Sequence, residues 1–247
     1  MANFSLKASS MNQKASKNTL VFTPEVVWVP LAFALLIWLV FWFELRFSYN
    51  FTPFGVLPRS PKGLRGIIFS PFIHSTLSHL WHNTIPAVVL TGGLFYFYRG
   101  VAWKVLGILV LGAGVGTWLI GREAYHIGAS GVIYGLASFL FFKGIWSKNF
   151  RLTAFSLIVV FLYGSLIWGT LPLQEGMSWE GHLSGFITGT ILAFVIRSKI
   201  AKPTKYAWED QDYNPEEDPF LRQFDADGNF IDPPPPEEDE DGIQSPN

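Results

Sequence analysis

Six apolar runs, each close to the length needed to cross a bilayer, constrain this chain more than any other feature. They cover approximately residues 26–43, 79–98, 101–120, 131–142, 152–168 and 181–196, and the fourth is the shortest because Lys143 interrupts it. A helix needs roughly 20 apolar residues to cross a hydrocarbon core of about 30 Å. The composition agrees, since 49% of the 247 residues are hydrophobic and only 15% are charged. These features predict an all-α polytopic membrane protein with six transmembrane helices.

The distribution of basic residues predicts the orientation of these spans. Twelve Lys and Arg residues fall in the N-terminal segment, in or beside the loops after the second and fourth runs, and directly after the sixth run. The other three loops hold five. Because basic residues concentrate on the cytoplasmic side, we expect both termini in the cytoplasm of a multi-pass protein. A bacterial plasma (inner) membrane is the expected location, with an organelle membrane as the alternative.

Composition also divides the chain into three parts. Residues 1–22 are polar and are expected to form a cytoplasmic N-terminal segment, and residues 23–200 form the membrane domain. Residues 201–247 form an acidic, proline-rich tail that is expected to be disordered, because fourteen of the nineteen acidic residues lie between 209 and 241. The stretch "DADGNFID" in this tail resembles a calcium loop only superficially. Aligning Gly228 with the loop's fixed glycine puts Gln223 and Pro234 at ligand positions.

Polar residues inside apolar spans are costly and therefore mark functional sites. The second run begins with His79 and Asn83, the fourth begins beside Ser130 and carries Tyr134, and the sixth begins with His182. The second, fourth and sixth spans cross the membrane in the same direction, so their first residues lie on one side at similar depth. We therefore expect these side chains to converge on a site that opens to the outside.

The converging residue types indicate acyl-transfer chemistry. The hydroxyl of Ser130 needs a neighbouring base to attack a carbonyl, and neutral His182 suits that role. His79, Asn83 and the backbone amide of Ser130 could donate hydrogen bonds to the oxyanion. Tyr134 is expected to stack on the His182 ring, because no acidic residue is expected nearby in the spans, so a dyad is favoured over a triad. A serine about 10 Å below the outer interface also requires a water-filled cavity.

Small residues repeat at intervals of four in two of the spans. Gly131 and Gly135 lie in the fourth, and Gly181, Gly185 and Gly189 lie in the sixth. Such stripes let helix backbones approach closely, so the fourth and sixth spans are expected to pack together. Helix packing is also the commonest explanation for an isolated "GASG" sequence.

Three motifs together resemble the rhomboid family of intramembrane serine proteases. They are "HSTLSHLWHN" at 74–83, "GASGVIYG" at 128–135 and "GHLSGFITG" at 181–189, and the resemblance extends over roughly residues 24–198. It implies a six-helix rhomboid-like bundle in which Ser130 is the nucleophile and His182 its base. One departure is that the first outside loop lacks the Trp-Arg pair of many bacterial members.

The resemblance also implies roles for the surrounding residues. His79 and Asn83 match the family pair that contributes to the oxyanion site, and Tyr134 matches the tyrosine that packs against the imidazole. Gly128 is the first glycine of the family's G-x-S-G motif. His74 matches a further family histidine in the loop before the second helix, where a structural hydrogen bond is as plausible as a chemical role. His82 and His126 receive no role.

The function expected from these observations is a serine endopeptidase that cleaves membrane-protein substrates in or beside their transmembrane segments. The expected partners are such substrates and the lipid bilayer, with no nucleic acid, metal or cofactor, and the sequence leaves the oligomeric state open. One alternative is a catalytically silent rhomboid-like scaffold that binds transmembrane helices. Another is a small transporter or proton channel, although the spans carry neither deeper charges nor an internal repeat.

Overall fold

The computed structural model describes residues 22–198 except 148, 174 and 175, and residues 212–231 except 219 and 226. The chain divides into two compact units, Met1–Lys202 and Pro203–Asn247. The predicted N-terminal segment lies almost entirely outside the described residues, as do residues 201–211 and 232–247 of the predicted tail.

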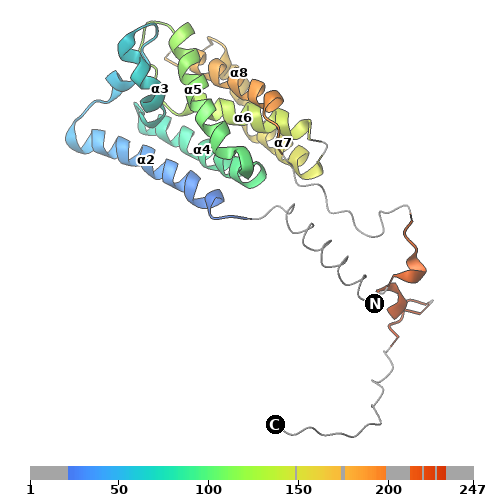
Figure 1. Cartoon of the computed structure of the whole chain (residues 1–247). Helices are drawn as coiled ribbons and strands as arrows, with labels where there is room; N and C mark the ends of the chain where they lie inside the picture. The colour runs from blue at the N-terminus through green and yellow to red at the C-terminus, as the bar shows by residue number, and fades with distance from the viewer. Residues whose placement is uncertain are drawn as a thin grey trace, which may run out of the picture. The chain divides into compact units, whose positions relative to one another are not determined.

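The described residues of the first unit form seven α-helices and several short 3-10 segments, which are joined by loops. Its seven α-helices are α2 (Glu25–Phe47), α3 (Gly66–Phe69), α4 (Leu77–Phe97), α5 (Ala102–Ile120), α6 (Ser130–Ile145), α7 (Phe150–Tyr163) and α8 (Trp179–Val195) (Figure 1). Six of them lie where the sequence predicts apolar spans, and α3 is a single turn in the loop between α2 and α4. The fifth predicted span is only partly α-helical, because the chain continues after α7 as the 3-10 segment η5 (Gly164–Thr170).

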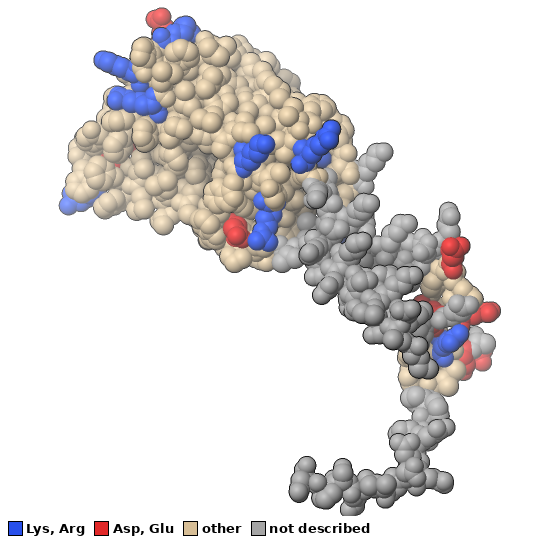
Figure 2. All heavy atoms as spheres, viewed as in Figure 1, with Lys and Arg blue, Asp and Glu red and all other residues tan. Residues whose placement is uncertain are grey.

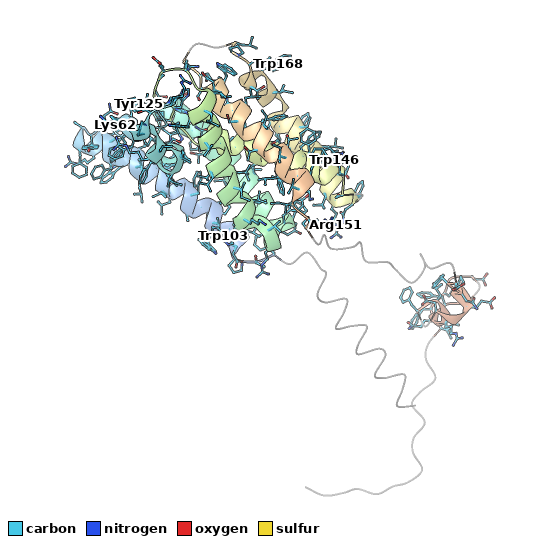
Figure 3. The ribbon with its side chains drawn as sticks, turned by 45° about the horizontal axis from the view of Figure 1, so that its top comes forward. Lys62, Trp103, Tyr125, Trp146, Arg151 and Trp168 are labelled. Carbon is cyan, nitrogen blue, oxygen red and sulfur yellow. The ribbon has the colours of Figure 1, made fainter. Side chains whose placement is uncertain are left out.

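Two helical segments are long and apolar enough to cross a membrane by length and composition. These are Glu25–Phe47 and Arg99–Ile120, while α6 and α7 are shorter apolar helices. The visible face of this unit carries few charged side chains between two groups of basic residues (Figure 2). Trp103, Trp146 and Arg151 lie toward one end of the unit, and Lys62 and Tyr125 lie on the opposite side (Figure 3). Tryptophan and basic residues bordering an apolar surface are typical of proteins embedded in a bilayer.

Helix α6 occupies the centre of this unit. It contacts α4, α5, α7 and α8, and its longest interface is with α8. A Cβ atom added to Gly185 would overlap the carbonyl oxygen of Gly131, and one added to Gly189 would overlap that of Gly135. The predicted glycine stripes therefore lie in one close helix contact. Gly181 contributes through its carbonyl oxygen, which lies 3.1 Å from a Cβ position on Gly131, while its own Cβ position is nearest to Ser178 Oγ, at 2.9 Å.

Lys143 joins the C-terminal ends of the same two helices. This residue lies in the last turn of α6, and its Nζ donates hydrogen bonds to the carbonyl oxygens of Ala193 (3.0 Å) and Ile196. These are carbonyl groups at the C-terminal end of α8, where a cation is electrostatically favourable. The lysine that interrupts the fourth apolar run thus caps the sixth-span helix.

The loop between α2 and α4 folds onto the end of α5 and the loop that follows it. Arg59 donates to the carbonyl oxygen of Gly121 (2.7 Å), and the indole of Trp118 donates to that of Ser60 (2.9 Å). Val56 and His126 form a two-residue antiparallel bridge. Backbone contacts of this kind depend on loop geometry and have no pattern in the sequence, so this arrangement was not predicted.

The second unit has local structure within its described residues. Short 3-10 turns occur at η7 (Pro215–Glu217) and η8 (Leu221–Gln223), and the Asp225 carboxylate accepts hydrogen bonds from the backbone N–H groups of Asp227 and Asn229. Side-chain acceptors such as Asp225 can order a short turn locally without any apolar core. The expected disorder of residues 201–247 stays a prediction.

Candidate active site

Ser130 and His182 are in direct contact. Ser130 is the first residue of α6 and His182 lies in the first turn of α8, and the distance from Oγ to Nε2 is 2.8 Å. The other ring nitrogen, Nδ1, lies 2.9 Å from the carbonyl oxygen of Gly169. Because a carbonyl can only accept, Nδ1 must carry the proton of the neutral ring. Nε2 is then left with a lone pair that can accept the serine proton.

Stacking on Tyr134 fixes the plane of the His182 ring. The Tyr134 ring stacks on it with centroids 4.1 Å apart and an interplanar angle of 8°. A Cβ atom on Gly169 would overlap the Tyr134 hydroxyl, so only glycine fits where η5 passes the two rings. Sequence reasoning missed Gly169, because it lies in an apolar run where a glycine has no distinguishing pattern.

The expectation that no acidic side chain lies near the base is wrong, because Glu180 lies close to His182 in the first turn of α8. It precedes His182 by two residues and is 1% exposed. Its carboxylate does not take the orienting role of a triad acid, because the Nδ1 partner is the Gly169 carbonyl. It forms an ion pair with Arg122 at 3.1 Å instead. The expectation failed because Glu180 was counted with the loop before the sixth span, whereas it lies inside α8.

The loop that leads into Ser130 passes directly beside His79 and Asn83. Gly128 has φ of +107°, a conformation that strongly favours glycine. A Cβ atom there would lie 2.6 Å from His79 Nε2 and 3.5 Å from Asn83 Nδ2. Thr76 caps the start of α4 by accepting a hydrogen bond from the backbone N–H of His79. The predicted convergence of the starts of α4, α6 and α8 is therefore present in the structure.

The Asn83 side chain is buried, at 5% exposure, and its Nδ2 has no hydrogen-bond partner among the described residues. Buried donors are normally paired, so an unpaired one at a site is a candidate for binding a ligand. No side chain caps the start of α6 either, which leaves the first backbone N–H groups of that helix as additional donors.

His74 and His126 occupy buried positions outside the helices. The His74 ring lies edge-on to the His79 ring, with centroids 5.0 Å apart. Burial, with a contribution from nearby His79, lowers the pKa of His74 to about 3, so this ring is neutral near pH 7. His126 received no role from the sequence, yet its Nδ1 lies 2.6 Å from the Ser178 hydroxyl and its Nε2 lies 3.1 Å from the Arg122 carbonyl.

The converging side chains line a cavity of about 720 Å³. Its walls come from α4, the loop between α5 and α6, the start of α6 and the start of α8. The residues of the predicted site that line it are His79, Asn83, Ser130, Tyr134 and His182. Its polar lining and size allow it to hold water.

The sequence of this region identifies the protein family to which the chain belongs. Residues 61–199 match the family model of the Rhomboid domain. The chain belongs to the rhomboid family. The matched segment contains every predicted site residue from His74 to Gly189, whereas α2 precedes it.

Proteins similar to this chain occur in mycobacteria and in a plant. Uncharacterized proteins of Mycobacterium tuberculosis and Mycobacterium bovis are each 38% identical to the chain over 154 residues, which is 58% of this chain and 63% of theirs. "RHOMBOID-like protein 2" of Arabidopsis thaliana is 27% identical over 145 residues, covering 56% of this chain and 43% of the plant protein. The match thus spans a little less than two thirds of the length of these mycobacterial relatives.

Rhomboid-family proteins are embedded in membranes, which agrees with the two long apolar helices. The family includes both proteases and inactive relatives. Membership therefore indicates a protease-like membrane protein, and the chemistry must be argued from the geometry around Ser130.

Proposed function

We propose that this protein is an intramembrane serine endopeptidase that uses Ser130 as nucleophile and His182 as general base. The observation that carries the proposal is the 2.8 Å contact between Ser130 Oγ and His182 Nε2, with Nδ1 fixed by the Gly169 carbonyl. That arrangement gives the imidazole the tautomer that a base needs. An inactive scaffold has no need for such a contact in a water-accessible cavity.

The proposed reaction proceeds in two stages. Ser130 Oγ attacks the substrate carbonyl as its proton passes to His182 Nε2, and His182 then gives that proton to the leaving amine. Water from the cavity hydrolyses the acyl-enzyme, with His182 again acting as base. Tyr134 keeps the ring in its plane throughout, because a charged imidazolium retains the same stacking contact and the same bond from Nδ1 to Gly169.

The oxyanion is proposed to bind at His79, Asn83 and the backbone N–H of Ser130. The unpaired Nδ2 of Asn83 supports this role, and so does the position of the group beside Gly128. Donors that are already oriented stabilise developing negative charge without reorganisation.

Replacing Asn83 by alanine should lower kcat by about 10²- to 10³-fold with little change in KM, because an oxyanion donor acts mainly in the transition state. Steady-state cleavage of a transmembrane reporter in liposomes measures both constants. The neighbouring change Thr84→Val is the control, since Thr84 bonds the Leu80 carbonyl and the Trp38 indole on another face of α4. An Asn83→Ala effect confined to KM would contradict the oxyanion role.

The proposed substrates are membrane proteins cleaved in or beside a transmembrane helix. Carbonyl groups within a helix are hydrogen-bonded and shielded, so the substrate must unwind before attack. Small residues at the cleaved bond and helix-weakening Gly or Pro nearby would favour that step. We propose six membrane crossings in a bacterial plasma membrane, with both termini cytoplasmic and the cavity open to the outside.

A fluorophosphonate probe tests the proposed function without knowledge of the substrate. A serine protease should be labelled, and peptide mapping should place the label on Ser130. A scaffold or a channel should remain unlabelled. Absence of label from folded, liposome-reconstituted protein, or a label on another serine, would rule out the proposed nucleophile.

A further inference from the structure

The loop between α5 and α6 and the first turn of α8 each carry one member of the Ser130–His182 pair. Residues 121–129 lead directly into Ser130, and the turn that begins at Ser178 carries His182. The 2.8 Å contact between Oγ and Nε2 therefore depends on how this loop sits against this turn. The structure contains a separate set of polar contacts between the same two segments.

Arg122 makes most of these contacts. Its backbone N–H and its Nη1 donate to Glu180 Oε1 at 3.1 and 3.2 Å, and Nη1 also lies 3.1 Å from Oε2. Its Nη2 donates to the carbonyl oxygen of Met177 at 2.8 Å. One arginine thus holds both the residue before the N-cap of α8 and a carboxylate in its first turn.

A second contact replaces the usual helix cap. Ser178 is the N-cap residue of α8, yet its side chain does not bond to the backbone of its own helix. Its hydroxyl bonds His126 Nδ1 at 2.6 Å, and His126 Nε2 lies 3.1 Å from the Arg122 carbonyl. A serine at this position ordinarily caps its own helix. Here the Ser178 hydroxyl connects the start of α8 to the α5–α6 loop instead.

The burial of Glu180 strengthens the contact between the α5–α6 loop and the first turn of α8. The Glu180 side chain is 2% exposed and that of Arg122 is 43% exposed. A carboxylate removed from water needs a fixed partner, so Glu180 strongly favours the arrangement in which Arg122 reaches it. Displacing the loop would break the ion pair and the backbone N–H bond together.

We propose that Arg122 and Glu180 are positioning residues that hold Ser130 and His182 in register by clamping the α5–α6 loop to the first turn of α8. This inference rests on the proposed function, because register matters only if the pair reacts. Neither residue touches the reacting atoms. They act by fixing the position of Ser130 relative to His182. A displacement of about 1 Å between reacting groups can reduce a rate about 10²-fold.

The test compares rate constants for fluorophosphonate labelling in Glu180→Gln, Arg122→Gln and wild-type protein reconstituted in liposomes. We expect each variant to react about 10- to 100-fold more slowly per active site. The final labelled fraction, measured after long exposure, counts the folded sites. A purely structural role would lower that fraction and leave the rate constant of the remaining sites unchanged, which would overturn the inference.

Two further variants sharpen the result. Arg59→Gln removes an arginine that bonds the same loop at the Gly121 carbonyl without reaching α8, so its rate constant should stay near that of wild type. Arg122→Lys keeps the charge and should recover part of the rate lost in Arg122→Gln. An equal loss in Arg59→Gln would overturn the clamp. Failure of wild-type protein to label would count against the proposed function itself.

Discussion

Ser130→Ala and His182→Ala should each reduce cleavage of a transmembrane substrate by at least about 10⁴-fold, and the double variant should be no worse than either single variant. The two side chains act as one unit: the hydroxyl is a poor nucleophile without its base, and the base has nothing to activate without the hydroxyl. Steady-state cleavage in liposomes, with the three variants measured in parallel, checks this non-additivity.

A second serine and histidine pair provides the control. Ser78 Oγ lies 3.3 Å from His82 Nδ1 on the exposed side of α4. That histidine nitrogen also lies 2.7 Å from the Ser78 carbonyl, which indicates that Nδ1 carries a proton and cannot accept from the hydroxyl. Ser78→Ala should therefore retain activity. Additive losses from Ser130→Ala and His182→Ala, or loss of activity in Ser78→Ala, would contradict the assignment.

Gly185→Val should have the largest effect on stability, about 3 kcal/mol or more, since a side chain there would meet the backbone of α6. The Cβ position overlaps the carbonyl oxygen of Gly131 and lies 3.2 Å from its Cα atom, and neither atom can rotate away as a side chain would. The helices would have to separate, which would also increase the distance from His182 to Ser130. Thermal unfolding in detergent, followed by the fluorescence of the tryptophans, measures the loss.

Gly107→Ala is the matched control for a helical glycine. It lies in α5, and apart from its own stretch of helix no described atom is found within 4 Å of its Cβ position. Alanine at such a site should leave the unfolding temperature unchanged or raise it slightly, because alanine favours the helix by up to about 1 kcal/mol over glycine. An unfolding temperature for Gly185→Val equal to that of wild type would show that the two helices pack less closely than the structure has them.

The convergence of Ser130 and His182 could be predicted from the sequence for a simple reason. Spans of even number cross in the same direction, so the polar residues at their starts share one side and one depth. Stripes of glycine then identify the helices that pack together. Both arguments use only residue type and spacing, and neither needs the conformation of a loop.

The supporting contacts could not be predicted, because they are made by backbone atoms and loop side chains. The Gly169 carbonyl that orients His182 belongs to a 3-10 segment hidden within an apolar run. The partner of Glu180 lies 58 residues away, and its identity depends on the path of the α5–α6 loop. Any residue type can supply a backbone carbonyl oxygen. A hydrogen bond to such an oxygen therefore cannot be recognised in the sequence.

Lys143 helps to hold α6 and α8 together along their whole length. The two helices are joined by Ser130 and His182 at one end, by glycine contacts along their length and by the bonds from Lys143 to Ala193 and Ile196 at the other. Helices that are close-packed and bonded at both ends resist separation. Under the proposed function, we therefore expect a substrate helix to enter by displacing the other helices, while the contact between Ser130 and His182 stays in place.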